Sequence, residues 1–206
     1  MLTVHKMLQA SVISLLFGFT FSAAAAEIKS TTSYSADRSI ETTSGGIMHG
    51  KVYHTPDKER SEQEISGQIQ TMIMRKDKGV MWILIPAQRM YLEQPLNMEQ
   101  HQDPANMPVL EMTEEGKETI NGMKTTKYKV RMQGENDTEF DGYMWHTAEG
   151  IMVKMDATSG DDKRKERVKI ELTNIDISEQ EPTLFEIPKG YSTLGGLQDM
   201  MKNLAR

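Results

Sequence analysis

The sequence has 206 residues, 37% of them hydrophobic, with 24 basic against 30 acidic side chains and a formal net charge of −6. This length predicts one domain with a substantial core, and the acidic balance argues against nucleic-acid binding, because nucleic-acid-binding proteins neutralise phosphates with excess Lys and Arg. The absence of cysteine excludes disulfides, thiolate metal sites, cysteine nucleophiles and a lipid anchor attached to cysteine.

Residues 1–26 have the pattern of a secretory signal peptide. A short basic start precedes an apolar run over 12–21, and small residues follow up to Ala26. The run is too short to span a membrane, and its small-residue end is typical of a cleavage site. We therefore predict export to the periplasm, cleavage after Ala26, and a single domain over 27–206 without a lipid anchor.

After the signal peptide, apolar and polar residues alternate with a period of two more often than with the 3.6-residue period of a helix. Turn residues recur at short intervals, for example at Gly45-Gly46, Asp77-Lys78-Gly79 and Glu149-Gly150. The pattern predicts a mainly β protein with roughly nine to eleven antiparallel strands. Such a meander forms a barrel, a half-barrel or a sandwich.

The stretch GVMWILIPAQRMYLEQ, residues 79–94, contains six apolar residues in a row. Val80–Ile85 would present apolar side chains to both faces of a sheet, and the chain returns through Met90–Leu92 after a proline corner. Both faces of the first strand must therefore be covered. Packing within the sheet explains one face; the other would be covered by the proline-rich segment, a C-terminal helix, or a ligand in a cavity.

Residues 95–110 interrupt the β pattern with three prolines and form a candidate lid. Met98, His101 and Met107 lie in this segment, and thioether and imidazole groups are donors that suit copper(I). Their loose spacing is typical of a loop, so a lid is the favoured interpretation. A copper-handling protein is the alternative.

Asn121-Gly122, between two strand-like runs, predicts a tight hairpin. In the run KYKVRMQ that follows it, Tyr128, Val130 and Met132 alternate with charged residues and form one apolar face of a strand.

The run Val168–Leu172 alternates in the same way, but Ile175 and Ile177 have the opposite phase. This change of phase predicts a bulge or a strand end near Thr173. The tail from Leu194 predicts a short helix that packs against an apolar opening of the sheet, with one apolar face formed by Leu197, Met200, Met201 and Leu204.

The chain has 17 methionines but only five phenylalanines and two tryptophans. Flexible methionine side chains suit an interior that repacks around variable alkyl chains, although they also fill ordinary cores. The histidines are scattered, and we interpret His49 and His54, which flank a predicted strand, as surface or hairpin residues. Since the sequence contains no hydrolase, zinc-protease or nucleotide-binding motif, we predict a protein without enzymatic activity or a cofactor.

Five segments occur in the order found in a known family. They are GKVYHTPDKERSEQE (50–64), MIMRKDKGVMWILIPAQRMYLEQ (72–94), GKETINGMKTTKYKV (116–130), GYMWHTAEGIMVKMD (142–156) and LFEIPKGY (184–191). With these segments the chain resembles the LolA/LolB-like superfamily, and most closely a periplasmic family described as outer-membrane-lipoprotein-sorting-like. The resemblance implies a strongly curved, half-open antiparallel β-barrel. It also implies a cap of loop or short helix and C-terminal helix over a hydrophobic cavity that holds acyl chains.

We therefore predict a periplasmic binding or carrier protein that holds a lipid, or the acyl chain of a lipidated protein, in the concave face of the sheet. An envelope protein would be a further partner. The alternatives are the copper-handling protein and a structural or interaction module with a filled interior. The candidates for the cavity wall are Trp82, Leu84, Met90, Leu92, Tyr128, Val130, Met132, Phe140 and Met144. Met81, Ile83 and Ile85 could point inward in place of Trp82 and Leu84.

Overall fold

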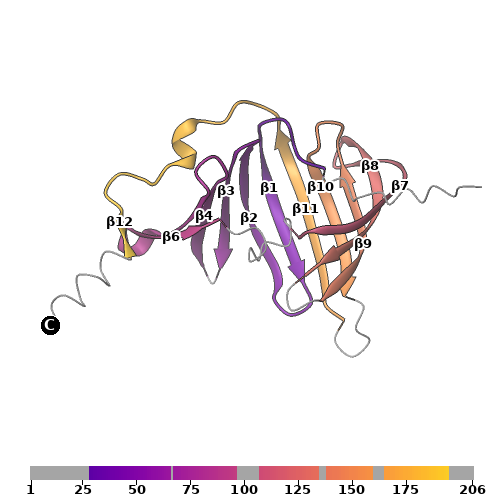
Figure 1. Cartoon of the computed structure of the whole chain (residues 1–206), viewed down its shortest axis with the longest axis horizontal. Helices are drawn as coiled ribbons and strands as arrows, with labels where there is room; N and C mark the ends of the chain where they lie inside the picture. Colours follow the sequence, from indigo (N-terminus) through magenta and orange to yellow (C-terminus); the bar gives the residue numbers. More distant parts are fainter. Residues whose placement is uncertain (1–27, 66, 97–106, 135–137, 160–164, 195–206) are drawn as a thin grey trace, which may run out of the picture.

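A computed structural model of the chain describes residues 28–65, 67–96, 107–134, 138–159 and 165–194. They form one sheet with the strand order β12-β6-β5-β4-β3-β2-β1-β11-β10-β9-β8-β7 (Figure 1). The strands are β1 (Tyr34–Thr42), β2 (Gly46–Thr55), β3 (Lys58–Ile65), β4 (Gln68–Arg75), β5 (Val80–Ile85), β6 (Met90–Pro95), β7 (Val109–Ile120), β8 (Met123–Gln133), β9 (Glu139–His146), β10 (Met152–Ser159), β11 (Arg167–Asp176) and β12 (Ser192–Thr193).

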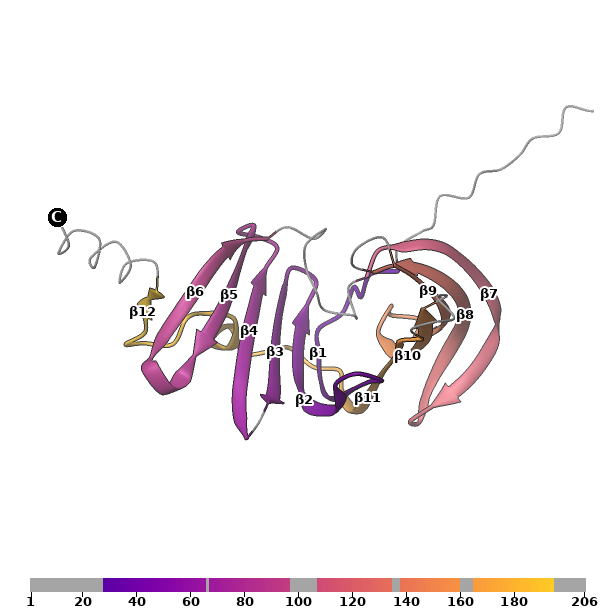
Figure 2. The same cartoon turned by 90° about the horizontal axis from the view of Figure 1, so that it is seen from below.

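The strand order joins two meanders at β1. The chain runs outward from β1 to β6, continues at the opposite edge with β7, and returns strand by strand to β11, which pairs with β1. Every pairing is antiparallel except that of β12 with β6. Figure 2 shows that β7 to β11 curl into an arc while β3 to β6 lie flatter, and the sheet does not close into a barrel. The sheet therefore has a concave and a convex face.

Two glycines on the concave face allow neighbouring strands to approach closely. A Cβ added at Gly142 would collide with the backbone of Asp156 and Ala157 on β10, and one added at Gly50 would collide with the carbonyl of Glu62 on β3. Neither glycine has a positive φ, so space rather than backbone conformation requires glycine at both positions.

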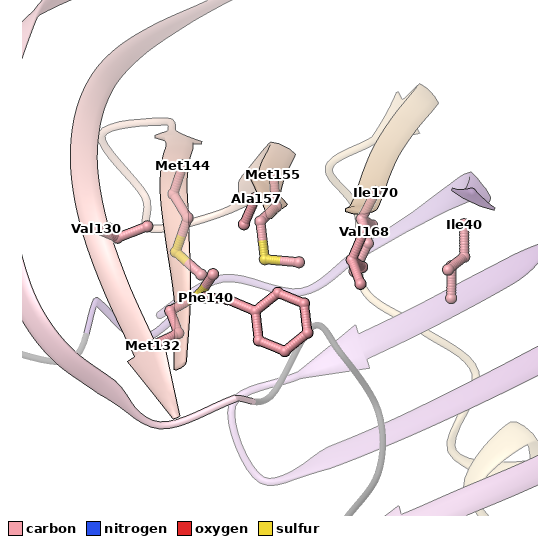
Figure 3. Close-up of a cluster of buried hydrophobic side chains, with 9 residues drawn as sticks. All are labelled: Ile40, Val130, Met132, Phe140, Met144, Met155, Ala157, Val168 and Ile170. Carbon is pink, nitrogen blue, oxygen red and sulfur yellow. The ribbon is translucent and has the colours of Figure 1, made fainter. Parts of the chain in front are cut away.

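The main core lies on the concave side of the arc. Figure 3 shows Met132, Phe140, Met144 and Met155 pointing toward one another from the curved strands. Apolar side chains alternate with polar ones along these strands because successive residues of a strand point to opposite faces. The buried members of this cluster are Ile40, Val130, Met132, Phe140, Met144, Met155, Ala157, Val168 and Ile170.

The C-terminal segment covers the convex face of the flatter half of the sheet. A 3-10 helix, η5 (Pro182–Phe185), places Phe185 against Ile73, Trp82 and Leu84, and Phe185 is 1% exposed. Arg75 fixes the segment by donating hydrogen bonds to the Phe185 carbonyl oxygen at 3.1 Å and to Glu186. This segment therefore covers the second face of the apolar strand β5.

Several sequence predictions are confirmed. Asn121 and Gly122 both have positive φ, at 50° and 81°, and connect β7 to β8 as a two-residue hairpin turn. Asn174 also has a positive φ, and the register of β1 with β11 shifts opposite it, which is the predicted irregularity near Thr173. The sheet is mainly antiparallel and open, as expected, with one more strand than the predicted upper count.

The structure describes only part of the segments that were predicted to form the cap. The described residues contain no helix of seven or more residues, and none long and apolar enough to cross a membrane. The predicted signal peptide (1–26), residues 97–106 of the candidate lid and the apolar tail positions Leu197, Met200, Met201 and Leu204 lie outside the described residues.

Candidate functional site

A cavity of about 890 Å³ lies on the concave face of the sheet. Its walls come from β1, β2, β3, β7, β9, β10 and β11, and the segment 28–30 before β1 forms part of its rim. A hydrogen bond from the Thr31 amide to the Glu149 carbonyl holds this rim against the turn between β9 and β10. The volume falls within the range of about 300–1,000 Å³ found for small-molecule sites.

Apolar side chains line the part of the cavity nearest the arc. Met107, Val109 and Met112 approach it from β7 and the residues just before it, and Met144 and Met152 from β9 and β10. Because thioether side chains have several rotatable bonds and polarizable sulfur, this wall can repack around apolar groups of different shape. The floor continues with Val52, Ile170 and Leu172.

A polar cluster of Arg38, His54 and Glu59 lies on the cavity surface formed by β1, β2 and β3. The register pairs His54 with both Tyr34 and Glu59, so these side chains share the concave face. His54 Nδ1 lies 3.2 Å from Glu59 Oε2, and the imidazole ring stacks on Tyr34 with 5.0 Å between ring centroids. Arg38 and His54 are 5% and 7% exposed.

His54 and Arg38 favour the ionised form of Glu59 in this cluster. Burial by itself would raise the pKa of Glu59, but the hydrogen bond with His54 and the positive charge of Arg38 lower it below its usual value. Glu59 is therefore ionised at neutral pH. Because an ionised carboxylate only accepts hydrogen bonds, the proton of the imidazole in this contact lies on Nδ1.

A second histidine, His146, lines the cavity at the end of β9. Burial lowers its pKa below the ordinary value, and the contact between His146 Nδ1 and the Gly150 carbonyl oxygen at 3.4 Å offsets this only in part. His146 is therefore neutral at neutral pH and contributes polarity without charge. The ring of Tyr128 meets it edge to face, with centroids 6.1 Å apart.

The structure places the predicted cavity residues on two different faces. Met144 lines the cavity, and Val130, Met132 and Phe140 are buried in the cluster on the same concave side, with Tyr128 packed against that cluster. Register places Met90 and Leu92 on the concave face too, but they are not part of the cavity wall.

Trp82 and Leu84 differ from the expected placement. They pair with Ile73 and Thr71 on the convex face and lie under the C-terminal segment. Since β5 is apolar on both faces, alternation could not tell its two faces apart. The neighbouring β5 residues Met81 and Ile83 lie on the concave face instead, and they are two of the positions that the sequence analysis left open.

His54 also corrects the sequence interpretation. It was expected at the surface or in a hairpin; it does lie in the β2–β3 hairpin, but it is buried in the polar cluster of the cavity. The sequence analysis also missed Arg38 and Glu59. A signal was present for Arg38, because it occupies an apolar position of the alternating run Tyr34, Ala36, Arg38, Ile40.

The alternative copper site cannot be compared in full. Met98 and His101 lie outside the described residues, and Met107 lines the cavity. In the described part of the chain, no three His, Asp or Glu side chains come together as a group that could hold a metal ion.

Comparison with known proteins identifies related sequences and folds. Residues 40–155 match the model of a family described as "Domain of unknown function (DUF4412)". A search of curated proteins found no match. An uncharacterized conserved protein from Thermus thermophilus has a similar structure, with 14% identity over 80% of this chain and 90% of that chain, and a TM-score of 0.53.

Two further solved structures are similar. MucB shares 12% identity over 80% of this chain, with a TM-score of 0.51, and this chain spans 60% of that protein. A putative outer membrane lipoprotein-sorting protein domain from Vibrio parahaemolyticus shares 8% identity over 75% of this chain and 89% of that chain, with a TM-score of 0.37. The likeness to the Thermus protein and to MucB shows a shared fold.

Proposed function

The chain belongs to the DUF4412 family, and we propose that it is a non-enzymatic periplasmic protein that binds a lipid, or the acyl chain of a lipidated protein, in its concave cavity. One observation carries the proposal: the apolar side of the curved sheet surrounds a cavity of about 890 Å³. A cavity of this size on an otherwise filled apolar face can accommodate an elongated apolar molecule.

Burial of alkyl groups supplies enough free energy for such a function. Each buried CH₂ group contributes about 0.8 kcal/mol, so a long acyl chain contributes on the order of 10 kcal/mol before the costs of ordering and association. Binding then needs apolar area and an adaptable wall rather than a reactive group. The methionines Met107, Met112, Met144 and Met152 supply such a wall.

The export part of the proposal rests on the sequence. The apolar run over 12–21 and the small residues up to Ala26 support cleavage after Ala26 and a mature single domain over 27–206 in the periplasm. A periplasmic binding protein would transfer its ligand between envelope sites, and we include an envelope protein as its partner in that step.

Filling the cavity tests the function at one side chain. Met112 is partly buried, pairs with Val130 and lines the cavity, so Met112→Trp should reduce the available volume and weaken the uptake of a fluorescent fatty acid about tenfold or more. Fluorescence titration of the delipidated protein measures this affinity.

The neighbouring residue on β7 provides the matched control. Thr113 pairs with Lys129 on the convex face and is exposed, so Thr113→Trp adds the same side chain outside the cavity. It should leave the affinity unchanged. Equal affinities of both variants and the unmodified protein would place the binding elsewhere and contradict the proposal.

A further inference from the structure

The two ends of the cavity differ in chemical character. The polar cluster occupies β1, β2 and β3, and Asp57 and Lys76 add charge at the adjacent rim. The apolar wall around Met112 and Met144 lies on β7 and β9. With strands spaced about 4.8 Å apart, and β1, β11 and β10 between β2 and β9, the two ends are separated by roughly 20 Å along the sheet.

Arg38 is the feature of the polar end that an apolar ligand does not explain. It is 5% exposed on the concave face of β1, and its direct neighbours across the sheet are Gly50 and Leu172. Even a paired guanidinium group, once buried, stabilises a fold no better than an apolar side chain of similar size, so stability alone does not explain an arginine at this position. Its place on the cavity surface suits Arg38 to receive the anionic group of a ligand.

The lining of the cavity carries an excess of positive charge. Lys29, Arg38 and Lys76 are cationic, and Asp57 and Glu59 are anionic. Glu59 balances part of the Arg38 charge, and the lining residues that the structure describes keep one net positive charge. A guanidinium group presents several donors in one plane, which matches the paired oxygens of a carboxylate or phosphate.

His54 adds hydrogen-bonding capacity beside Arg38. Its Nδ1 is used by Glu59, while its Nε2 is buried and has no hydrogen-bond partner among the residues that the structure describes. Buried polar atoms are nearly always satisfied by protein, water or ligand. A headgroup that reaches the cluster would satisfy Nε2 through a hydroxyl donor, or through an anionic oxygen when the imidazole is protonated.

We propose that the ligand is an acyl lipid with an anionic headgroup, whose carboxylate or phosphate oxygens bind Arg38 while its alkyl chain lies along the methionine wall. This inference rests on the proposed function and specifies the class of its ligand. The apolar wall supplies most of the affinity, and the polar end selects the headgroup and fixes the direction in which the lipid lies.

The test compares ligands that differ only in the headgroup. Delipidated protein is titrated with hexadecanoate, hexadecyl phosphate and the uncharged hexadecanol, each competing with a fluorescent fatty acid below its micelle-forming concentration. The unmodified protein should bind either anion about tenfold more tightly than the alcohol, as expected for charge-assisted hydrogen bonds. Inorganic phosphate alone should not compete, because it lacks the alkyl chain.

Arg38→Gln should remove the preference for anions while the affinity for hexadecanol stays within roughly twofold. Lys51→Gln is the matched control, since Lys51 is 60% exposed on the convex side of β2 and its loss removes the same charge outside the cavity. It should keep the preference. If Arg38→Gln does not fold, Arg38→Lys keeps the charge without the planar guanidinium and should bind hexadecanoate with reduced preference.

The outcomes separate the inference from the function on which it rests. Equal binding of anions and alcohol by the unmodified protein would overturn the headgroup inference and leave an apolar carrier. Tight binding of inorganic phosphate alone would also overturn it, because the site would then serve a free anion. Failure to bind any of the three alkyl compounds would overturn the proposed function itself.

Discussion

Arg75 shows how one residue fixes the convex side of the sheet. Its guanidinium group donates hydrogen bonds to both carboxylate oxygens of Asp77 at 2.7 Å and to the carbonyl oxygen of Phe185, and its side chain is 5% exposed. The hydrogen bonds from Arg75 lower the pKa of Asp77 to about 2. Arg75 thus joins the turn after β4 to the C-terminal segment.

The lowered pKa of Asp77 predicts a pH dependence. A carboxyl group whose pKa is lower in the folded protein stabilises that state above its ordinary pKa of 3.8 and loses the contribution as the pH falls toward about 2. Asp77→Asn should therefore reduce the free energy of unfolding at pH 7, and the difference from the unmodified protein should shrink below pH 4. Urea denaturation over this pH range measures both values; a difference that stays constant down to pH 2 would contradict the assignment.

At the same scale, the sequence located the apolar part of the site better than its polar part. Val130 and Met132 were predicted because each alternates with charged residues along one strand, a purely local pattern. Arg38, His54 and Glu59 come from three different strands, and only the register of those strands brings them together. Single-strand periodicity carries no information about that register.

At the scale of elements, the C-terminal segment stabilises the flatter half of the sheet. Phe185 from η5 packs on Ile73, Trp82 and Leu84, so that the convex face of β5 is covered by the protein itself. The ligand-binding proposal therefore concerns the concave face alone.

Truncating Phe185 should destabilise the protein without affecting ligand binding. Phe185→Ala removes a fully buried ring and should lower the free energy of unfolding by about 3–5 kcal/mol, measured by urea denaturation. The exposed neighbour Thr183 is the control, and Thr183→Ala should change it by less than about 0.5 kcal/mol. Fatty-acid affinity, measured under conditions where both variants are folded, should stay unchanged; a loss specific to Phe185→Ala would mean that the convex face takes part in binding.

The strands and turns were largely predictable from the sequence, whereas the segment that covers the convex face of β5 was not. Asn121-Gly122 encodes its turn through two residues that tolerate positive φ, and Asn174 marks the irregularity in β11. By contrast, Phe185 contacts Trp82 although about one hundred residues separate them in the chain, and the local sequence of neither segment predicts this contact. The apolar strand β5 indicated only that a cover was needed.

At the scale of the whole molecule, the two faces of the curved sheet differ in how they are covered. The C-terminal segment, held by Arg75 of β4, covers the convex face of the flatter half of the sheet, and the concave face is filled near the arc but open at a cavity of about 890 Å³. The resemblance to lipoprotein-sorting-like proteins predicted the curved, half-open sheet and a cavity on its concave face, but not the cover on the convex face. Composition alone did not decide between a cavity and a methionine-filled core.

Native mass spectrometry of the full chain, purified from an envelope fraction without detergent or denaturant, tests the central claim most directly. The account predicts a folded protein carrying an additional mass that organic extraction identifies as a lipid and that a fluorescent fatty acid displaces. A copper mass in place of lipid would favour the metal-handling alternative. A protein that is empty when isolated and takes up no fatty acid would contradict the account and leave a structural module with an unoccupied concave face.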